Sequence, residues 1–394
     1  MEPSDLGPLG RLLASRGDES DAVDLGLVVG DPDGGFDTVA VVVDGERIVS
    51  TAALLDETVY LDGVAIPAGQ VELVATDPDY EGRGLVRALM SWAHERSRQR
   101  GHLMQVMIGI PYFYRQFGYD YAIPMHPWRE VCGERPRSAV GVTVRRATAD
   151  DIGALHALHE GEQARFGLRM PHSPACWRWI VARDGSHQWV ADHDGVVAAT
   201  CRSVPPEEGG AVGEVAARDA EAAVALLDHC LVEAGQVVQL RVQHRPGTVA
   251  GDAIEPFLAA PAGPGAQEWY YARIEHVGPL LQHLEPVLVR RLHDAGLAYE
   301  RRDVLISWFR GHVRFAIDAE GITGLTTGGP EQAPGSKGGS GVPPDALPAL
   351  LFGPYGAEGL EERFPDCYLD TQRELMAALF PPVTADLLTF YLPT

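Results

Sequence analysis

The stretch VATDPDYEGRGLVRALM, residues Val74–Met90, decides the fold of the first third of this chain. Apolar and polar residues alternate over Val71–Thr76, which is the period of a half-buried strand. Asp77 and Pro78 end that strand, and from Gly84 onward the apolar residues recur at helical spacing. The sequence therefore predicts a strand, a glycine-containing loop and a helix in direct succession.

The loop of this unit has the composition of an anion site. Gly82 and Gly84 lie where the helix starts, so backbone N–H groups at the positive end of the helix dipole are left free for an anion such as a pyrophosphate. A second apolar run follows at Leu103–Ile110, and PYFYRQFGYDYAIP (111–124) predicts a short helix that ends at Gly118. Because glycines open many ordinary turns, the interpretation depends on the order of all these elements.

This order resembles that of the GNAT acyltransferases. Their strand-loop-helix carries R/Q-x-x-G-x-G/A, and here the matching residues are Glu81-Gly82-Arg83-Gly84-Leu85-Val86. Their last helix reads F-Y-x-x-x-G-F/Y, and here the matching residues are Phe113-Tyr114-Arg115-Gln116-Phe117-Gly118-Tyr119. More closely, the chain is similar to the enhanced intracellular survival (Eis) family, in which a GNAT domain is followed by a degenerate GNAT region and a sterol-carrier-like domain.

The resemblance implies an α/β fold with mixed sheets, in which tandem GNAT folds are followed by a sterol-carrier-protein-2-like domain. We expect an N-terminal GNAT domain over residues 1–133, a second, degenerate GNAT-like domain over 141–266, and the sterol-carrier-like domain over 268–394. The strand and helix order is repeated after residue 141, but AARDAEAA (216–223) stands where a phosphate loop would be. The second unit is therefore expected to lack a cofactor site.

Local patterns predict the remaining elements. A flexible loop rich in Gly, Pro and Ser is expected at 326–344. One short helix is expected around Leu9–Leu13, followed by two Asp-Gly hairpins, Thr38–Val43 with Arg47–Leu55 and Val59–Leu61 with Val64–Ile66.

Composition narrows the function. The 394 residues carry a formal net charge of −23, so the chain has no basic footprint for nucleic acid. An acidic surface attracts cations such as polyamines or amino sugars, although solubility alone accounts for it equally well. The sequence shows neither a secretory signal nor a membrane-length apolar stretch, and its five cysteines lie far apart without C-x-x-C. We expect a cytoplasmic protein without a metal, and the resemblance implies a homo-hexamer.

The resemblance also assigns a site for acetyl-CoA. Val74, Ala75 and Thr76 lie at the strand end whose backbone pairs with pantetheine in this family. Glu81 departs from the family's Arg or Gln, and a carboxylate facing a pyrophosphate would be repulsive. Further matches are Gly109 and Ile110 on the facing strand and, in the pyrophosphate loop, Gly82, Arg83, Gly84, Leu85, Val86 and Arg87, with both arginines as charge partners.

Acyl transfer from a thioester to an amine needs a base for the ammonium and an acid for the departing thiolate. Tyr114 matches the family's acid, and the alternative is a packed aromatic. The family's base is the C-terminal carboxylate, here that of Thr394, and the apolar ending DLLTFYLPT is unusual for a disordered tail. Glu72, on the coenzyme strand, is the alternative base.

Other conspicuous side chains have ordinary interpretations. His156 and His159 fit no complete metal motif and are expected on the surface. Trp177, Trp179 and Trp189 are candidates to line a pocket, but core packing is the favoured interpretation.

The sequence therefore favours an acetyl-CoA-dependent N-acetyltransferase acting on a small cationic amine, such as an aminoglycoside-, polyamine- or amino-acid-like metabolite. The alternative is a catalytically silent GNAT-like protein that binds acyl-CoA or lipid.

Overall fold

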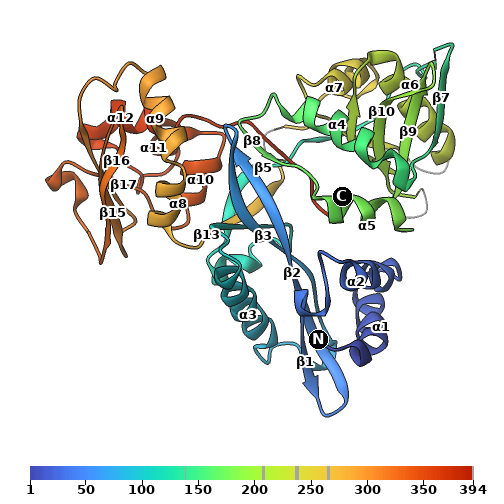
Figure 1. Cartoon of the computed structure of the whole chain (residues 1–394), viewed down its shortest axis with the longest axis horizontal. Helices are drawn as coiled ribbons and strands as arrows, with labels where there is room; N and C mark the ends of the chain where they lie inside the picture. The colour runs from blue at the N-terminus through green and yellow to red at the C-terminus, as the bar shows by residue number, and fades with distance from the viewer. Residues whose placement is uncertain (138, 206–208, 236–238, 264–266, 393–394) are drawn as a thin grey trace.

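The computed structural model describes residues 1–394 except 138, 206–208, 236–238, 264–266 and 393–394. Figure 1 shows three lobes: the N-terminal part at the bottom, the middle of the chain at the upper right and the C-terminal third at the upper left. The described strands form sheets of eight, six and four strands. No helix in the described part of the chain has the length and apolar character needed to cross a membrane.

The first lobe has the strand, loop and helix order that the sequence predicts. One expectation is wrong: two helices of 11 residues each stand where a single short helix was expected. α1 buries leucine side chains against the sheet, and α2 buries a leucine and a valine there. The elements are α1 (Leu6–Arg16), α2 (Ser20–Gly30), β1 (Val39–Asp44), β2 (Arg47–Leu61), β3 (Val64–Thr76), α3 (Leu85–Gln99), β4 (Met104–Met107), a 3₁₀ helix (Phe113–Phe117) and β5 (Asp120–Pro124).

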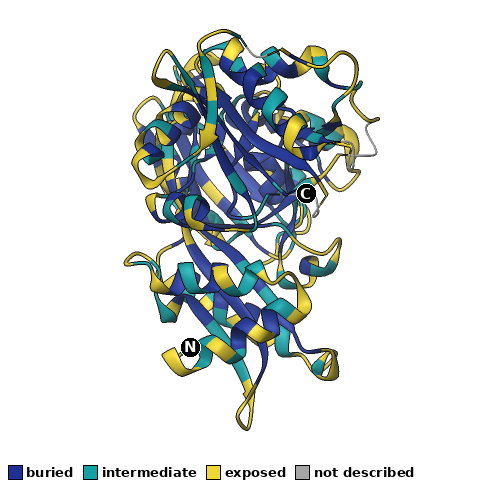
Figure 2. Ribbon diagram, turned by 90° about the vertical axis from the view of Figure 1, so that its right-hand side faces the viewer, coloured by how far each residue is buried: buried dark blue, intermediate teal, exposed yellow. Residues whose placement is uncertain are grey.

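β2 and β3 form one long hairpin. The two predicted hairpins are present, but they share strands, because β2 runs without interruption for 15 residues and β3 for 13. Their turn, Asp62 and Gly63, has positive φ at both residues (46° and 88°), as the tight turns of twisted hairpins require. Most residues of both strands are buried, and Figure 2 shows them in dark blue within the molecule.

Strands from distant parts of the sequence complete the sheet of this hairpin. The order is β18-β8-β2-β3-β4-β13-β5, with β1 paired to β2. β13 (Trp269–Ile274) lies between β4 and β5, while β8 (Leu168–Met170) and β18 (Ala385–Leu387) extend the opposite edge. One apolar cluster runs from this sheet into the C-terminal lobe. The eight-stranded sheet thus joins all three lobes, and the division at residue 268 stays a prediction.

The second lobe repeats the order of the first, as predicted. β3 breaks its register with β2 at Leu73, which has a φ of +51°, and β11 breaks its register with β10 at Glu214, which has a φ of +53°. Both are β-bulges, which bend a strand and end its regular pairing. The elements are β6 (Trp128–Glu130), β7 (Val142–Arg146), α4 (Ile152–Gln163), α5 (Pro174–Ala182), β9 (His187–His193), β10 (Val196–Ser203), β11 (Ala211–Ala217), α6 (Ala220–Ala234), β12 (Arg241–Gln243) and α7 (Val249–Ile254).

The third lobe packs helices on a four-stranded sheet. The Gly- and Pro-rich stretch expected to be one flexible loop instead contains the end of β16, a 3₁₀ helix (Pro334–Lys337) and β17. The elements are α8 (Val277–His283), α9 (Glu285–Asp294), β14 (Arg302–Ser307), β15 (His312–Asp318), β16 (Gly321–Gly328), β17 (Ser340–Gly341), α10 (Leu347–Phe352), α11 (Gly356–Arg363) and α12 (Arg373–Leu379).

Candidate active site

The bulge in β3 opens an edge of the sheet. β3 pairs in parallel with β4 only at residues 68–70, and beyond Gln70 the described parts of the two strands have no ladder between them. On the other side β2 keeps Ala75 and Thr76 in register, and Ser50 Oγ lies 2.7 Å from Thr76 Oγ1. Val74, Ala75 and Thr76 therefore border a gap between strands whose backbone groups can pair with an extended ligand.

The predicted pyrophosphate loop lies directly after that gap. Gly82 and Gly84 have φ values of +73° and +80°, which side-chain-bearing residues rarely adopt, and residues 81–84 are exposed. Gly84 precedes α3, so the N–H groups of Leu85, Val86 and Arg87 belong to the first turn and have no intrahelical acceptor. An exposed helix start with free donors fits a pyrophosphate.

The charged side chains of the loop have protein partners. Arg83 Nη2 donates to the Asp79 carbonyl at 2.7 Å, and Arg87 Nη2 donates to Gln116 Oε1 at 2.9 Å. Glu81 Oε1 lies 2.8 Å from Arg16 Nη2 of α1. The acidic departure from the family motif is thus paired with a cation, and both arginines remain exposed beside the loop.

Tyr114 and Gly109 are brought together at the end of β4. A Cβ on Gly109 would lie 2.3 Å from Tyr114 Cε2, so the ring packs directly on the glycine backbone. The ring contacts Phe113 and Tyr271 edge-on, with centroids 5.1 and 5.8 Å away. Burial, with a smaller contribution from the charge of Glu72, raises the pKa of Tyr114 to about 12. The phenol is therefore protonated at neutral pH, as a proton donor must be. Ile110, by contrast, is 64% exposed.

Glu72 lies on β3 immediately before the bulge. Burial raises the pKa of its carboxyl to about 8, and the hydrogen bond from Gln70 Nε2 opposes that rise. The charge of Asp21, on α2, raises it further. Thr394, the other candidate base, lies outside the described residues.

Three polar residues near Glu72 were missed by sequence reasoning: Asp24, Arg183 and Tyr391. Arg183 Nη2 lies 2.6 Å from Asp24 Oδ2, which ties the end of α5 to α2. Tyr391 donates to Asp21 Oδ1 at 3.2 Å. These contacts join segments more than 150 residues apart, so local sequence patterns do not reveal them. The apolar ending that contains Tyr391 was the one sequence feature that pointed to a docked C-terminal segment.

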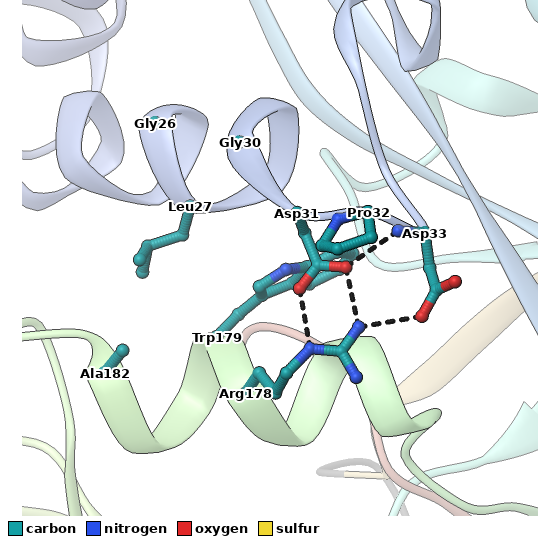
Figure 3. Close-up of a pocket in the computed structure, with 9 residues that line it drawn as sticks. All are labelled: Gly26, Leu27, Gly30, Asp31, Pro32, Asp33, Arg178, Trp179 and Ala182. Atoms are coloured by element: carbon teal, nitrogen blue, oxygen red, sulfur yellow. Dashed lines mark hydrogen bonds and ion pairs between the residues drawn. The ribbon is translucent and has the colours of Figure 1, made fainter. Parts of the chain in front are cut away.

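A groove of about 630 Å³ lies between α2 and α5. Figure 3 shows Arg178 of α5 reaching across it to two carboxylates, with Nη2 at 2.6 Å from Asp31 Oδ1 and 2.7 Å from Asp33 Oδ2. Trp179 lies on its wall with Leu27, so this tryptophan borders a cavity although it is only 5% exposed. Trp177 and Trp189 are buried as predicted.

One prediction for the second lobe is wrong. His159 is not a surface residue: it is 1% exposed, with its ring 5.3 Å from that of Trp177. Its burial depends on a tryptophan of another helix, which the spacing of histidines does not reveal. His156 is exposed, as expected.

Comparison with known proteins agrees with this geometry. Residues 35–122 match the family model of the acetyltransferase (GNAT) domain, whereas no curated protein matches the chain. A probable N-acyltransferase from Enterococcus faecalis has a similar structure, with a TM-score of 0.70 and 15% identity over 98% of both chains. A GCN5-related N-acetyltransferase from Anabaena variabilis gives a TM-score of 0.67 and 13% identity, over 98% of this chain and 97% of that one.

The whole-chain likeness extends to Eis1 from Mycobacterium abscessus, with a TM-score of 0.59 and 16% identity over 98% of this chain and 96% of that one. At such identities the likeness concerns the fold, while the family match concerns the first lobe itself. Residues 35–122 therefore match an acetyltransferase domain of the GNAT type, set in a whole-chain fold similar to that of Eis1.

Proposed function

We propose that the protein is an acetyl-CoA-dependent N-acetyltransferase that acts on a small cationic amine. The observation that carries the proposal is the open edge of β3 beyond Gln70, followed by the exposed glycine loop at the start of α3 and bordered at the end of β4 by the Tyr114 ring on Gly109. The charge of Glu72, on the same strand β3, contributes to the raised pKa of the Tyr114 phenol. Glu72 is an acid with a pKa near neutrality, and Tyr114 is a phenol that is protonated there.

The binding residues follow from the open edge and the loop. The backbone of Val74, Ala75 and Thr76 would hold the pantetheine arm, and the N–H groups of residues 82–87 would hold the pyrophosphate, with Arg83 and Arg87 beside it. Gly109 lets the Tyr114 ring approach the cleft from the other strand. In this proposal the thioester would lie between the two strand ends, where it would be held for attack.

Two residues compete for the role of base. Glu72 can take the proton of the ammonium, because a base works best when its pKa is near the working pH. The carboxylate of Thr394 is the base that the Eis resemblance implies. Tyr114 then gives its proton to the departing thiolate, and direct attack in a ternary complex needs no covalent intermediate.

The acceptor is proposed to be cationic. The charge of Asp21 of α2 acts on Glu72, whereas Asp24 of the same helix is paired with Arg183. Unpaired carboxylates favour an ammonium and disfavour an anionic acceptor.

A thiol-release assay with acetyl-CoA tests the proposal across polyamines, aminoglycosides and amino acids. We expect release above the hydrolysis background with at least one cationic amine. If no amine gives release and calorimetry detects no acetyl-CoA binding, the proposal fails, and a silent protein that binds acyl-CoA or lipid takes its place.

We also propose a cytoplasmic homo-hexamer whose third lobe is sterol-carrier-like, as the Eis resemblance implies. Light scattering on the purified chain tests the oligomeric state, and a monomer would contradict this proposal.

A further inference from the structure

The matched bulges align the clefts of the two GNAT-like units residue by residue. Ala75 pairs with Thr51 in the first unit, and Ala216 pairs with Thr200 in the second. Val215 therefore corresponds to Val74, one of the residues proposed to hold pantetheine. The same backbone positions border an open edge in the first unit, whereas side chains of this chain occupy them in the second.

An arginine and an aspartate fill the gap beside β11. Arg245 Nη1 donates to the Val215 carbonyl at 2.9 Å. Its Nε and Nη2 atoms lie 3.0 and 2.5 Å from the carboxylate of Asp386, which also lies 2.8 Å from His126 Nε2. Arg245 and Asp386 are each only 2% exposed. Asp386 belongs to β18, so the group in this cleft comes from the C-terminal segment, residues 385–392.

The end of β11 is occupied as well. The Glu162 carboxylate accepts hydrogen bonds from the N–H groups of Ala217 at 3.2 Å and of Val249 and Ala250 at 2.9 Å each. These donors are therefore already used within the chain. The second unit thus lacks a phosphate loop, and side chains of the same chain fill its cleft.

The bulge residue also holds the C-terminal segment. Glu214 Oε1 lies 2.5 Å from Arg202 Nη2, and its other oxygen lies 2.9 Å from His172 Nε2. Arg202 in turn donates to the carbonyls of Phe390 at 2.7 Å and Thr389 at 2.9 Å. A buried carboxylate thus holds a buried arginine, and that arginine fixes two consecutive carbonyls of the segment.

The last described residues of the segment contact both units. Leu392 packs on the backbone of Gly213 in the second unit, where an added Cβ would lie 2.6 Å from Leu392 Cδ2. Phe390 contacts the ring of Trp179 edge-on at 5.6 Å. Tyr391 reaches α2, where its hydroxyl bonds Asp21.

We propose that the second unit has kept its cleft as a binding site whose ligand is now residues 385–392 of the same chain, and that this binding positions Tyr391 at the acceptor side of the first unit. The functional half of this inference rests on the proposed function. Arg202, Glu214 and Arg245 are then positioning residues, which act on the reaction through the segment they hold.

Hydrogen exchange followed by mass spectrometry tests the binding without any assay of activity. Gly213→Ala adds one methyl group against Leu392, and Gly161→Ala is its control, because a Cβ there meets nothing within 4 Å. We expect exchange of the peptide covering residues 388–392 to accelerate at least tenfold in Gly213→Ala, with the peptide of α12 unchanged. The double variant Gly213→Ala with Leu392→Ala should exchange slowly again in this peptide, because the smaller side chain at 392 leaves room for the added methyl group.

Arg202→Gln gives a second, independent perturbation. Its control is Arg129→Gln, which removes another buried arginine of the same lobe that holds the Ala259 carbonyl at 2.7 Å and touches nothing in the segment. Only Arg202→Gln should release the segment. Unchanged exchange of residues 388–392 in both Gly213→Ala and Arg202→Gln would overturn the binding half of the proposal.

Steady-state kinetics with the best amine of the panel tests positioning. We expect kcat/KM for the amine to fall at least fivefold in Gly213→Ala while the Kd of acetyl-CoA stays within twofold of the parent. If the segment had a purely structural role, Gly213→Ala would change neither kcat/KM for the amine nor the Kd of acetyl-CoA, or it would change both. A released segment with unchanged kcat/KM would overturn the positioning half. If the parent enzyme acetylates no amine, both the proposed function and the proposed positioning of Tyr391 fail. Hydrogen exchange then still decides whether the cleft of the second unit binds residues 385–392.

Discussion

Glu81 and Arg16 form an ion pair of 2.8 Å between the phosphate loop and helix α1. Both side chains are more than a third exposed, so the pair contributes little to stability. Its effect is local, because it neutralises the one carboxylate that departs from the family's loop motif.

The pairing predicts that Glu81→Gln changes the acetyl-CoA affinity by less than about 0.5 kcal/mol. Arg16→Gln leaves the carboxylate unpaired beside the loop and should weaken binding by about 0.5–1 kcal/mol, and the double variant should recover it. Calorimetry measures all three. Tightening by more than about 1 kcal/mol in Glu81→Gln would instead place the carboxylate against the pyrophosphate.

Tyr114→Phe keeps the ring that packs on Gly109 and removes only the proton. Coenzyme affinity should survive, while kcat falls about 10²-fold or more through loss of the general acid. Tyr112→Phe is the matched control, because Tyr112 is 72% exposed beside it. Near-normal turnover of the Tyr114 variant would make this residue a packing aromatic.

The pKa of Glu72, raised to about 8 by burial, sets an expected pH profile. A base works deprotonated, so kcat/KM for the amine should rise with pH and bend near pH 8. Glu72→Gln should lower the rate and remove that bend. Since free amines titrate as well, the bend is identified by the difference between the two profiles. The same bend in both enzymes would exclude Glu72 as the base.

Thr394 is tested through its terminal carboxylate. Thr394→Ala preserves that charge and should be nearly silent, whereas a short Gly/Ser tail converts the carboxylate to an amide and should reduce kcat strongly. Coenzyme affinity should stay intact, and the stability change should be about 1 kcal/mol or less. Full activity with the tail would leave Glu72 as the base.

The raised pKa of Glu57 predicts how the free energy of unfolding changes with pH. Burial, helped by the charges of Asp56 and Glu72, raises its pKa from 4.5 to about 8, so the folded state binds the proton more tightly than the unfolded state. The stabilising contribution of that proton is complete below pH 4.5 and is lost as pH rises through 8. Glu57→Gln should therefore be more stable than the parent at pH 9, on the order of 1–3 kcal/mol, and nearly equal at pH 4.

Thermal or urea unfolding at several pH values measures the difference. Glu46→Gln, at an exposed turn, should show no such trend. A parallel pH dependence for Glu57→Gln and the parent would contradict the assignment.

The strand, loop and helix around residues 74–90 could be predicted because their signals are local. Alternation, glycine positions and helical spacing all lie within one short stretch. Leu73 shows the limit, since strict alternation through it predicts a regular strand and not a residue at positive φ. The bulge becomes visible only when β2 is paired beside it.

What could not be predicted depends on contacts between distant segments. β13 enters the first sheet between β4 and β5 from about 150 residues downstream, and no property of its own sequence names those neighbours. The packing of His159 on Trp177 and the hydrogen bond from Tyr391 to Asp21 also depend on contacts between separate segments. Propensity describes an element, but its partners are chosen by the packing of the whole chain.

The shared eight-stranded sheet has a consequence for the order in which the protein matures during synthesis. When the first lobe leaves the ribosome, the edges of β2 and β4 that β8 and β13 later cover carry unpaired backbone groups. Those edges remain open until residues 168–170 and 269–274 have emerged, and Asp386 reaches Arg245 only after nearly the whole chain is made. The first sheet is therefore complete only after most of the chain has been synthesised, and until then its open edges can pair with other extended chains.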